Sequence, residues 1–227
     1  MSDVAVVIMA GGEGRRLRPY TYYCPKPLVK VSGRPLLEYS LELAESSKFS
    51  EVYVIGNYLG YQIKKYLVDS YSCAKYLHED EFLGTAGILR KFYDFDNVIV
   101  INADVISDIS LDDLYAHHVE LLSDVTVATK DYTTEIPYAV VNTEEGYIKK
   151  IREKPTYMNR IATGIYVLSQ KALGIGICHQ GKSRIDMPEV IKRCVGASLP
   201  VVVYPIKGTW IEVGNPESLL LAEKICR

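Results

Sequence analysis

The sequence predicts an α/β fold: a doubly wound, mostly parallel sheet with helices on both faces and a small β-rich half. Over the first 130 residues, short apolar runs typical of strands alternate with helix-length amphipathic segments, which is the order of a parallel sheet with crossover helices. The first run, Val4–Met9, is apolar throughout, as expected of a strand covered on both faces. A chain of 227 residues is long enough for one such domain.

The elements of the first half follow one another in strand–helix order. After the strand Val4–Met9, a helix is predicted over Leu36–Ala44, where Pro35 precedes a broad apolar face. Further strands are predicted at Glu51–Gly56, Lys75–His78, Asn97–Ile101 and Asp124–Thr129, and further helices at Tyr61–Leu67, Gly84–Tyr93 and Leu111–Leu122.

After residue 130 the pattern becomes rich in short strands. Three strands of a meander are predicted at Tyr138–Asn142, Tyr147–Arg152 and Ile165–Leu168, with a hairpin turn at residues 145–146. No repeat, low-complexity segment or linker interrupts the chain. The remaining predictions are a helix around Pro188–Arg193, strands at Val201–Ile206 and Trp210–Val213, and a last helix at Pro216–Ile225.

Charge and apolar patterning restrict the class of ligand. The formal net charge is −2, so the cations near the N-terminus are a local concentration. We therefore expect a small anionic ligand at one place and no nucleic acid. No apolar run approaches the ~20 residues of a membrane span, and no apolar signal region opens the chain, so we expect no membrane association.

The five cysteines are scattered and odd in number. They form no CxxC and no Cys/His pair at metal-ligand spacing, which predicts reduced thiols in a cytoplasmic protein. They are Cys24, Cys73, Cys178, Cys194 and Cys226.

A glycine-rich, cationic loop follows the first strand directly. Residues 9–27, MAGGEGRRLRPYTYYCPKP, hold three arginines and Lys26 against one acid, Glu13. The loop is not a P-loop, because no lysine follows its glycines, and not a dinucleotide fingerprint, because Leu17 stands in place of the third glycine. Glycines allow backbone N–H groups to approach an anion that arginines neutralise, so the pattern predicts a phosphate site. A tight turn with solvated arginines is the alternative.

Two further features point to the same ligand. Pro25 and Pro27 fix the backbone on either side of Lys26, which directs its ammonium group toward the anion. Asp104 follows the predicted strand at residues 97–101, and ligands of doubly wound sheets bind at the carboxyl ends of strands. A carboxylate opposite a triphosphate-sized cationic loop predicts Mg²⁺ held by that carboxylate and phosphate oxygens. For an aspartate alone, a helix cap or turn is the alternative.

Seven motifs, taken together, resemble the sugar-1-phosphate nucleotidyltransferases, in particular the single-domain, mannose-1-phosphate guanylyltransferase-like members. They are residues 10–17 (AGGEGRRL), 25–28 (PKPL), 84–87 (GTAG), 102–104 (NAD), 153–155 (EKP), 163–164 (TG) and 210–214 (WIEVG). The resemblance covers nearly the whole chain. It implies a Rossmann-like fold of the nucleotide-diphospho-sugar transferase type. It also implies transfer of a nucleotidyl group from an NTP to a sugar 1-phosphate, with Mg²⁺ as cofactor and release of pyrophosphate.

The resemblance further implies how the chain is divided. We expect a single nucleotidyltransferase domain over residues 1–227, without a C-terminal β-helix domain. Residues 1–130 would form its nucleotide-binding half and residues 131–227 its sugar-phosphate-binding half.

Roles carried over position by position complete the expected site. Arg16 and Lys26 would act on the reacting phosphates. Asp104 and Glu212 would hold Mg²⁺, although the family normally has aspartate at the second position. The nucleotide would be bound by Ala10, Gly11, Gly12, Gly14, Arg15, Glu79, Gly84 and Thr85. The sugar phosphate would be bound by Tyr138, Glu153, Lys154, Thr163 and Gly164.

The motifs indicate the type of reaction more closely than they indicate which NTP and which sugar phosphate react. The PKPL segment resembles that of mannose-1-phosphate guanylyltransferases, so we expect GTP and mannose 1-phosphate. UTP or dTTP with glucose 1-phosphate or an N-acetylhexosamine 1-phosphate is the alternative. Two other classes stay open: an enzyme for a non-sugar phosphate such as phosphocholine, and a non-catalytic regulatory subunit of the same fold. The retained Lys26, Asp104 and Lys154 argue against the subunit. A homo-oligomer is also left open.

Overall fold

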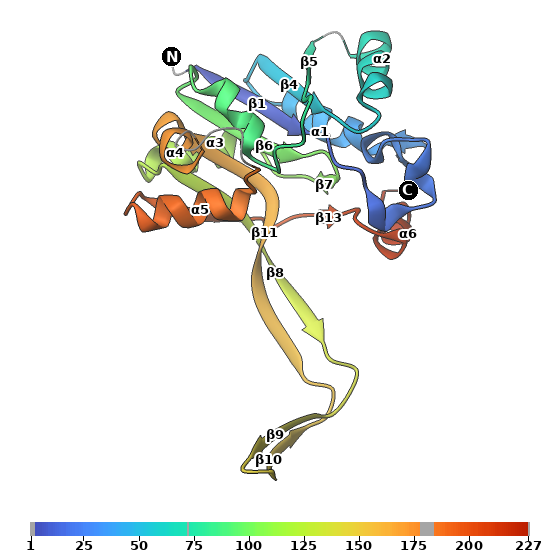
Figure 1. Ribbon diagram of the computed structural model, residues 1–227, viewed down its shortest axis with the longest axis vertical. Helices are drawn as coiled ribbons and strands as arrows, with labels where there is room; N and C mark the ends of the chain where they lie inside the picture. Colours follow the sequence, from blue (N-terminus) through green and yellow to red (C-terminus); the bar gives the residue numbers. More distant parts are fainter. Residues whose placement is uncertain (1–2, 72, 178–183, 227) are drawn as a thin grey trace.

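The computed structural model describes residues 3–71, 73–177 and 184–226 and has a seven-stranded sheet at its centre (Figure 1). The strand order is β12-β8-β11-β6-β1-β4-β5. β11 runs antiparallel to both neighbours, and the other neighbouring strands are parallel. The predicted doubly wound, mostly parallel sheet is therefore confirmed. Its strands are β1 (Val4–Met9), β4 (Glu51–Gly56), β5 (Ala74–His78), β6 (Asn97–Asn102), β8 (Val125–Glu135), β11 (Thr156–Ser169) and β12 (Val201–Pro205).

Helices cover both faces of the sheet because its central strands are apolar on both sides. Along β1, Val6 and its even-numbered neighbours belong to one buried cluster, whereas Val7 belongs to another. The first cluster takes side chains from α1 (Leu36–Glu45), α2 (Gly60–Ser70) and α3 (Leu111–Glu120). The second takes side chains from α4 (Gln170–Gly176), α5 (Met187–Gly196) and a 3-10 helix (Gly87–Phe92).

A third, smaller cluster lies between the first strand's loop and the C-terminal helix. It joins α6 (Pro216–Ile225) to the antiparallel pair β7 (Val105–Ser107) and β13 (Trp210–Glu212). Between β1 and α1 the chain forms 3-10 helices at Arg15–Leu17, Tyr20–Tyr22 and Lys26–Leu28 and the hairpin β2 (Lys30–Val31) and β3 (Arg34–Pro35).

One predicted helix differs in type and length. The sequence predicts a helix over Gly84–Tyr93, whereas the structure has a 3-10 helix over Gly87–Phe92. Gly84 has a φ of +84°, a left-handed conformation outside helical geometry. The N–H of Ala86 donates to the carbonyl of Ile185 (3.1 Å), so the start of the segment is bonded to a distant loop and not to itself.

The predicted meander is wrong, because the β-rich segment forms a long arm that leaves the body (Figure 1). β8 and β11 continue beyond the sheet as a paired ribbon, and a separate hairpin of β9 (Val140–Glu144) and β10 (Tyr147–Arg152) closes it. We call residues 130–161 the arm. The predicted turn at residues 145–146 is confirmed. The strand extensions were missed because residues 130–135 are mostly polar and give no apolar run.

The cysteines within the described residues are all free thiols, at Cys24, Cys73, Cys194 and Cys226, and Cys178 lies outside those residues. Over the same described part of the chain, no helix is long and apolar enough to cross a membrane.

His118 is a buried titratable residue of α3 that is hydrogen-bonded to two strands of the sheet. In its neutral form, Nδ1 accepts from the hydroxyl of Thr126 (2.8 Å) and Nε2–H donates to Oδ1 of Asn97 (3.2 Å). Burial lowers the pKa of His118 to about 4; Asp124 opposes this shift and His117 adds to it. The folded protein therefore binds this proton less readily than the unfolded chain does.

Stability is expected to fall with acidification below the unfolded-state pKa of His118. The contribution of the neutral imidazole is fully present above pH ~6.5 and is lost as the pH falls toward 4. Between pH 7.5 and pH 5 we expect the free energy of unfolding to fall by about 2 kcal/mol from this group. Urea unfolding of the wild type and of His118→Gln at both pH values isolates the contribution of His118 to the pH dependence of the free energy of unfolding. Equal pH slopes in the two proteins would contradict it.

Candidate functional site

A cleft of about 290 Å³ opens at the carboxyl ends of β1 and β6. The N–H of Ala103, after β6, donates to the carbonyl of Met9, at the end of β1 (3.1 Å). The two segments that carry the glycine-rich loop and the NAD motif therefore meet at this edge, where ligands of doubly wound sheets bind. Of the predicted site residues in the described chain, those lining the cleft are Ala10, Gly11, Gly12, Gly14, Arg15, Arg16, Lys26, Glu79, Thr85 and Asp104.

The glycine-rich loop is packed directly against Lys26. Gly14 has a φ of +62°, and a Cβ there would lie 2.9 Å from Cβ of Lys26. Thr21 donates its hydroxyl proton to the carbonyl of Gly14 (2.9 Å). Gly12 has no neighbour within 4 Å of a Cβ position, so its backbone is open to the cleft. The loop is thus fixed by Lys26 and Thr21 at Gly14, whereas its backbone at Gly12 is accessible to a ligand in the cleft.

One ion pair lies in the cleft and a second lies at its border. Nζ of Lys26 binds Oδ2 of Asp104, and Nη2 of Arg16 lies 3.4 Å from Oε1 of Glu212. β13 pairs with β7 so that Glu212 lies opposite Val105, next to Asp104. The antiparallel pair therefore brings two carboxylates that are 108 positions apart in sequence close to each other. Asp104 lines the cleft, whereas Glu212 lines an adjoining groove that shares Arg16 and Gly214 with the cleft.

The donor set fits a magnesium ion held partly by substrate. Oδ1 of Asp104 is buried and has no hydrogen-bond partner, so one carboxylate oxygen is free to ligate. In the described residues no group of three or more His, Cys, Asp or Glu side chains is placed to hold a metal. Mg²⁺ is commonly bound by one or two carboxylates together with substrate phosphates, so Asp104 and Glu212 would be enough protein ligands for it.

Glu79 and Thr85 form one side wall of the cleft. Glu79 is buried, its Oε1 accepts from the N–H of Leu83 (3.1 Å), and burial raises the pKa of its carboxyl group. Thr85 accepts the N–H of Met187 (2.8 Å) at the start of α5. Gly84 does not line the cleft; a Cβ there would clash with the carbonyl of Ile185.

Arg15 lines the cleft but is already paired. Its Nε and Nη2 donate to Glu13 (2.6 and 2.9 Å), and Arg18 also reaches Glu13 (3.5 Å). The single acid of the loop is therefore shared by the two arginines that are not paired with Glu212.

A sequence model of nucleotidyl transferases matches residues 5–226. The chain belongs to the nucleotidyl transferase family. Mannose-1-phosphate guanyltransferase of Pichia angusta is 29% identical, over 94% of this chain and 62% of its own length. UTP–glucose-1-phosphate uridylyltransferase of Synechocystis sp. is 27% identical, over 92% of this chain and 60% of its own. The chain thus spans about three fifths of the length of these relatives.

A solved structure shares the fold. HddC from Yersinia pseudotuberculosis, complexed with GMP-PN, has a TM-score of 0.75 at 22% identity, with 100% of both chains covered. The resemblance based on the seven motifs is thereby confirmed at the level of the family.

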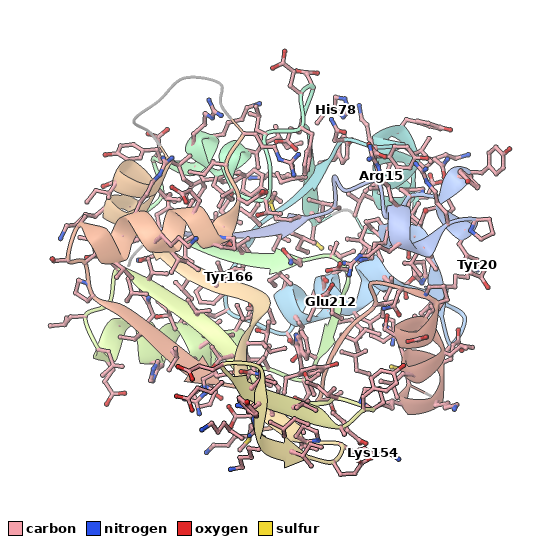
Figure 2. All side chains as sticks on the ribbon, turned by 60° about the horizontal axis from the view of Figure 1, so that its bottom comes forward. Arg15, Tyr20, His78, Lys154, Tyr166 and Glu212 are labelled. Atoms are coloured by element: carbon pink, nitrogen blue, oxygen red, sulfur yellow. The ribbon has the colours of Figure 1, made fainter. Side chains whose placement is uncertain are left out.

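The family's sugar-phosphate positions divide into two groups in this structure. Thr163 and Gly164 are buried at the base of the arm, where Gly164 allows close contact with Asn102, a residue of the cleft wall. Tyr138, Glu153 and Lys154 lie far out on the exposed arm and do not line the cleft. Figure 2 shows Glu212 within the body and Lys154 apart from it, on the arm. In a single chain these three residues therefore lie away from the cleft.

Sequence reasoning omitted several residues of the cleft wall. Asn102 lies within the NAD motif and Phe82 three positions after Glu79, so both were close to assigned residues. The side chain of Phe82 is partly exposed, and Arg184 stacks over it at 5.1 Å. The omitted lining residues are Met9, Pro27, Phe82, Asn102, Ala103 and Gly214.

Proposed function

We propose that the protein joins an NTP and a sugar 1-phosphate to give an NDP-sugar and pyrophosphate. The observation that carries the proposal is the double ion pair of Lys26 with Asp104 and Arg16 with Glu212. It places two cations suited to phosphates beside two carboxylates suited to Mg²⁺. They lie at a strand-end cleft in a chain that matches the family over residues 5–226.

The proposed reaction needs charge stabilisation and positioning, and no general base. A phosphate oxygen of the sugar 1-phosphate is already anionic and attacks the α-phosphorus of the NTP in line. The bond from that phosphorus to the bridging oxygen breaks, and the electron pair leaves with pyrophosphate. Lys26 and Arg16 would bind the triphosphate and stabilise the charge that develops on the leaving group.

The ion pairs explain how the site stays neutral before substrates bind. The side chains of Lys26 and Asp104 are only 12% and 21% exposed, so either charge alone would be poorly solvated. Mg²⁺ held by Asp104 and Glu212 would neutralise phosphate oxygens and fix their geometry. With substrates bound, Lys26 and Arg16 would pair with phosphate oxygens, which would leave the carboxylates of Asp104 and Glu212 available to hold the metal.

We propose GTP and mannose 1-phosphate as the substrate pair. The Pichia angusta relative carries the corresponding name, and the Synechocystis relative, of similar identity, supports UTP and glucose 1-phosphate as the alternative. Glu79 adds a chemical reason for guanine. Within the described residues its Oε1 accepts a hydrogen bond and its Oε2 accepts none. Adjacent N–H groups on the guanine edge offer a carboxylate two donors, whereas uracil offers one. A cytoplasmic location, supported by the free thiols, belongs to the same proposal.

A substrate matrix tests the proposed function. Four NTPs are each combined with mannose 1-phosphate, glucose 1-phosphate, an N-acetylhexosamine 1-phosphate and phosphocholine, and pyrophosphate release is measured with and without Mg²⁺. The highest rate is expected with GTP and mannose 1-phosphate. No release with any pair, and no pyrophosphate exchange into NTP, would identify a non-catalytic member of the family.

Lys154→Ala is expected to weaken the acceptor selectively. We assign this lysine to the phosphate of the sugar 1-phosphate, so the KM for that substrate should rise about tenfold or more, the value of one lost charge-assisted hydrogen bond. The Kd of the NTP, measured without sugar phosphate by calorimetry, should stay unchanged. Lys149→Ala, which removes an exposed lysine five positions earlier, is the matched control. An equal loss of NTP affinity would contradict the assignment.

A further inference from the structure

The arm is a two-stranded ribbon without a covering layer. Its residues from 131 to 135 and from 141 to 154 are exposed, and it projects from the body without contact to a helix (Figure 1). An isolated two-stranded hairpin is at best marginally stable in water and normally packs against another element. The geometry of the arm therefore calls for a surface that one chain does not supply.

The tip of the arm has one apolar face. The register of β9 and β10 pairs Val141 with Ile151 and Thr143 with Ile148, so these four side chains share a face. Val141, Ile148 and Ile151 are 43%, 64% and 59% exposed. The opposite face is mostly polar and carries Val140, Asn142, Glu144, Tyr147, Lys150 and Arg152. Such alternation is typical of a ribbon that covers something on one side.

The base of the arm is fixed in its projecting direction. The ammonium group of Lys130 donates to the carbonyls of Ile206 (3.2 Å) and Gly208 (2.6 Å). Thr163 is held on both sides: its hydroxyl donates to the carbonyl of Ala128 (2.8 Å), and its carbonyl accepts Nε1–H of Trp210 (2.9 Å). These bonds fix the direction in which the arm leaves the body, and its residues Tyr138, Glu153 and Lys154 do not line the cleft of their own chain.

A groove beside the cleft offers a seat for an apolar ribbon. It has a volume of about 440 Å³ and is lined by Tyr132, Ile161, Trp210 and Leu221, and it reaches Arg16 and Glu212. Polar side chains, those of Lys130, Asp131, Asn215 and Ser218, line it as well, and it shares Arg16 and Gly214 with the cleft. A ribbon seated there would bring the residues just behind its tip to the two ion pairs.

We propose that a second copy of this chain fills the groove, so that each arm completes the sugar-phosphate site of its partner. The apolar face of the tip seats in the groove of the partner, and Glu153 and Lys154 reach the partner's Arg16 and the partner's Glu212. The arrangement is isologous, because each copy gives an arm and receives one. The proposal rests on the proposed function for its choice of substrate residues, but not for the dimer itself.

The dimensions allow this arrangement. The 16 residues from Lys130 to the turn at Glu145 span about 50 Å at most when extended. A compact chain of 227 residues has a radius of gyration of about 17 Å. The arm is therefore long enough to cross from one body onto the cleft of another.

The first experiment measures mass. Light scattering after size exclusion should give a dimer for the wild type and a monomer for Ile148→Glu/Ile151→Glu. Tyr147→Ser, which removes the aromatic ring of an equally exposed residue on the opposite face, should remain dimeric. Unchanged circular dichroism of the glutamate variant would show that the body is folded. A monomeric wild type overturns the inference and leaves the proposed function in place.

The second experiment uses mixed dimers. Lys26→Ala and Lys154→Ala chains carry different affinity tags, are co-expressed and are purified over both tags. With shared sites, each mixed dimer has one site with both lysines intact, so turnover at low sugar phosphate should return to about half the wild-type value per dimer. Mixed dimers no more active than the two homodimers would mean that each site is built from one chain. A dimeric wild type with no turnover on any substrate pair refutes the proposed function, and the site-sharing with it.

Discussion

Replacing Lys26 with alanine is expected to lower kcat by about 10²–10³-fold, the typical cost of removing one transition-state stabiliser. The ammonium group lies in the cleft wall next to Asp104 and is nearly buried, so its charge acts in a poorly screened environment. Its interaction is strongest as negative charge develops on the leaving pyrophosphate, and such an interaction acts on kcat more than on KM. Steady-state kinetics with saturating Mg²⁺ measures both parameters.

The control for this variant addresses stability. Lys26→Ala leaves the carboxylate of Asp104 without its cation, so the melting temperature should fall without Mg²⁺ and recover when Mg²⁺ is added. Lys30→Ala, which removes an exposed lysine four positions later, should change neither kcat nor the melting temperature. A Lys26→Ala protein with normal kcat and only a raised KM would show that the lysine binds substrate and transition state equally.

The strands could be predicted from sequence where burial on both faces forces continuous apolar runs. Residues 4–9 and 97–102 are such runs, and their order in the chain defines a parallel sheet. The cleft could also be predicted, because ligands bind where such strands end. Its two ion pairs could not be predicted from sequence patterns, because they join residues that are 78 and 196 positions apart. A local pattern gives no information on contacts between residues so far apart in the chain.

The arm shows what local patterns leave out. The sequence of residues 147–152 predicts a strand with a turn before it, and both are present. Whether that hairpin lies on the body or projects from it depends on Lys130, whose partners are backbone carbonyls more than 75 positions away. The position of Lys154 relative to the cleft follows from this anchoring, and its own sequence neighbourhood gives no indication of it.

Glu212→Ala is expected to raise the Mg²⁺ concentration needed for half-maximal turnover by about 10–100-fold, the loss in metal affinity typical of disturbing a metal's surroundings. The carboxylate lies beside Asp104, through the β7–β13 pairing, and glutamate offers the same oxygens as the aspartate usual in the family. Because the side chain is longer by about one C–C bond of ~1.5 Å, we expect it to ligate directly after a small backbone adjustment or through a water. Turnover is measured over a Mg²⁺ titration, and Mn²⁺ affinity in the presence of NTP is measured by calorimetry.

A competing explanation is that Glu212 only orients Arg16, and a second substitution separates the two. Glu212→Gln keeps an oxygen to accept from Arg16 but loses the charge that a cation requires, so it should restore activity only if orientation is the whole role. The stability cost should be small for both variants, below about 1 kcal/mol, because the Arg16 and Glu212 side chains are 72% and 43% exposed. A glutamine variant with a wild-type Mg²⁺ response and unchanged Mn²⁺ affinity would leave Asp104 as the single protein ligand and assign Glu212 to Arg16 alone.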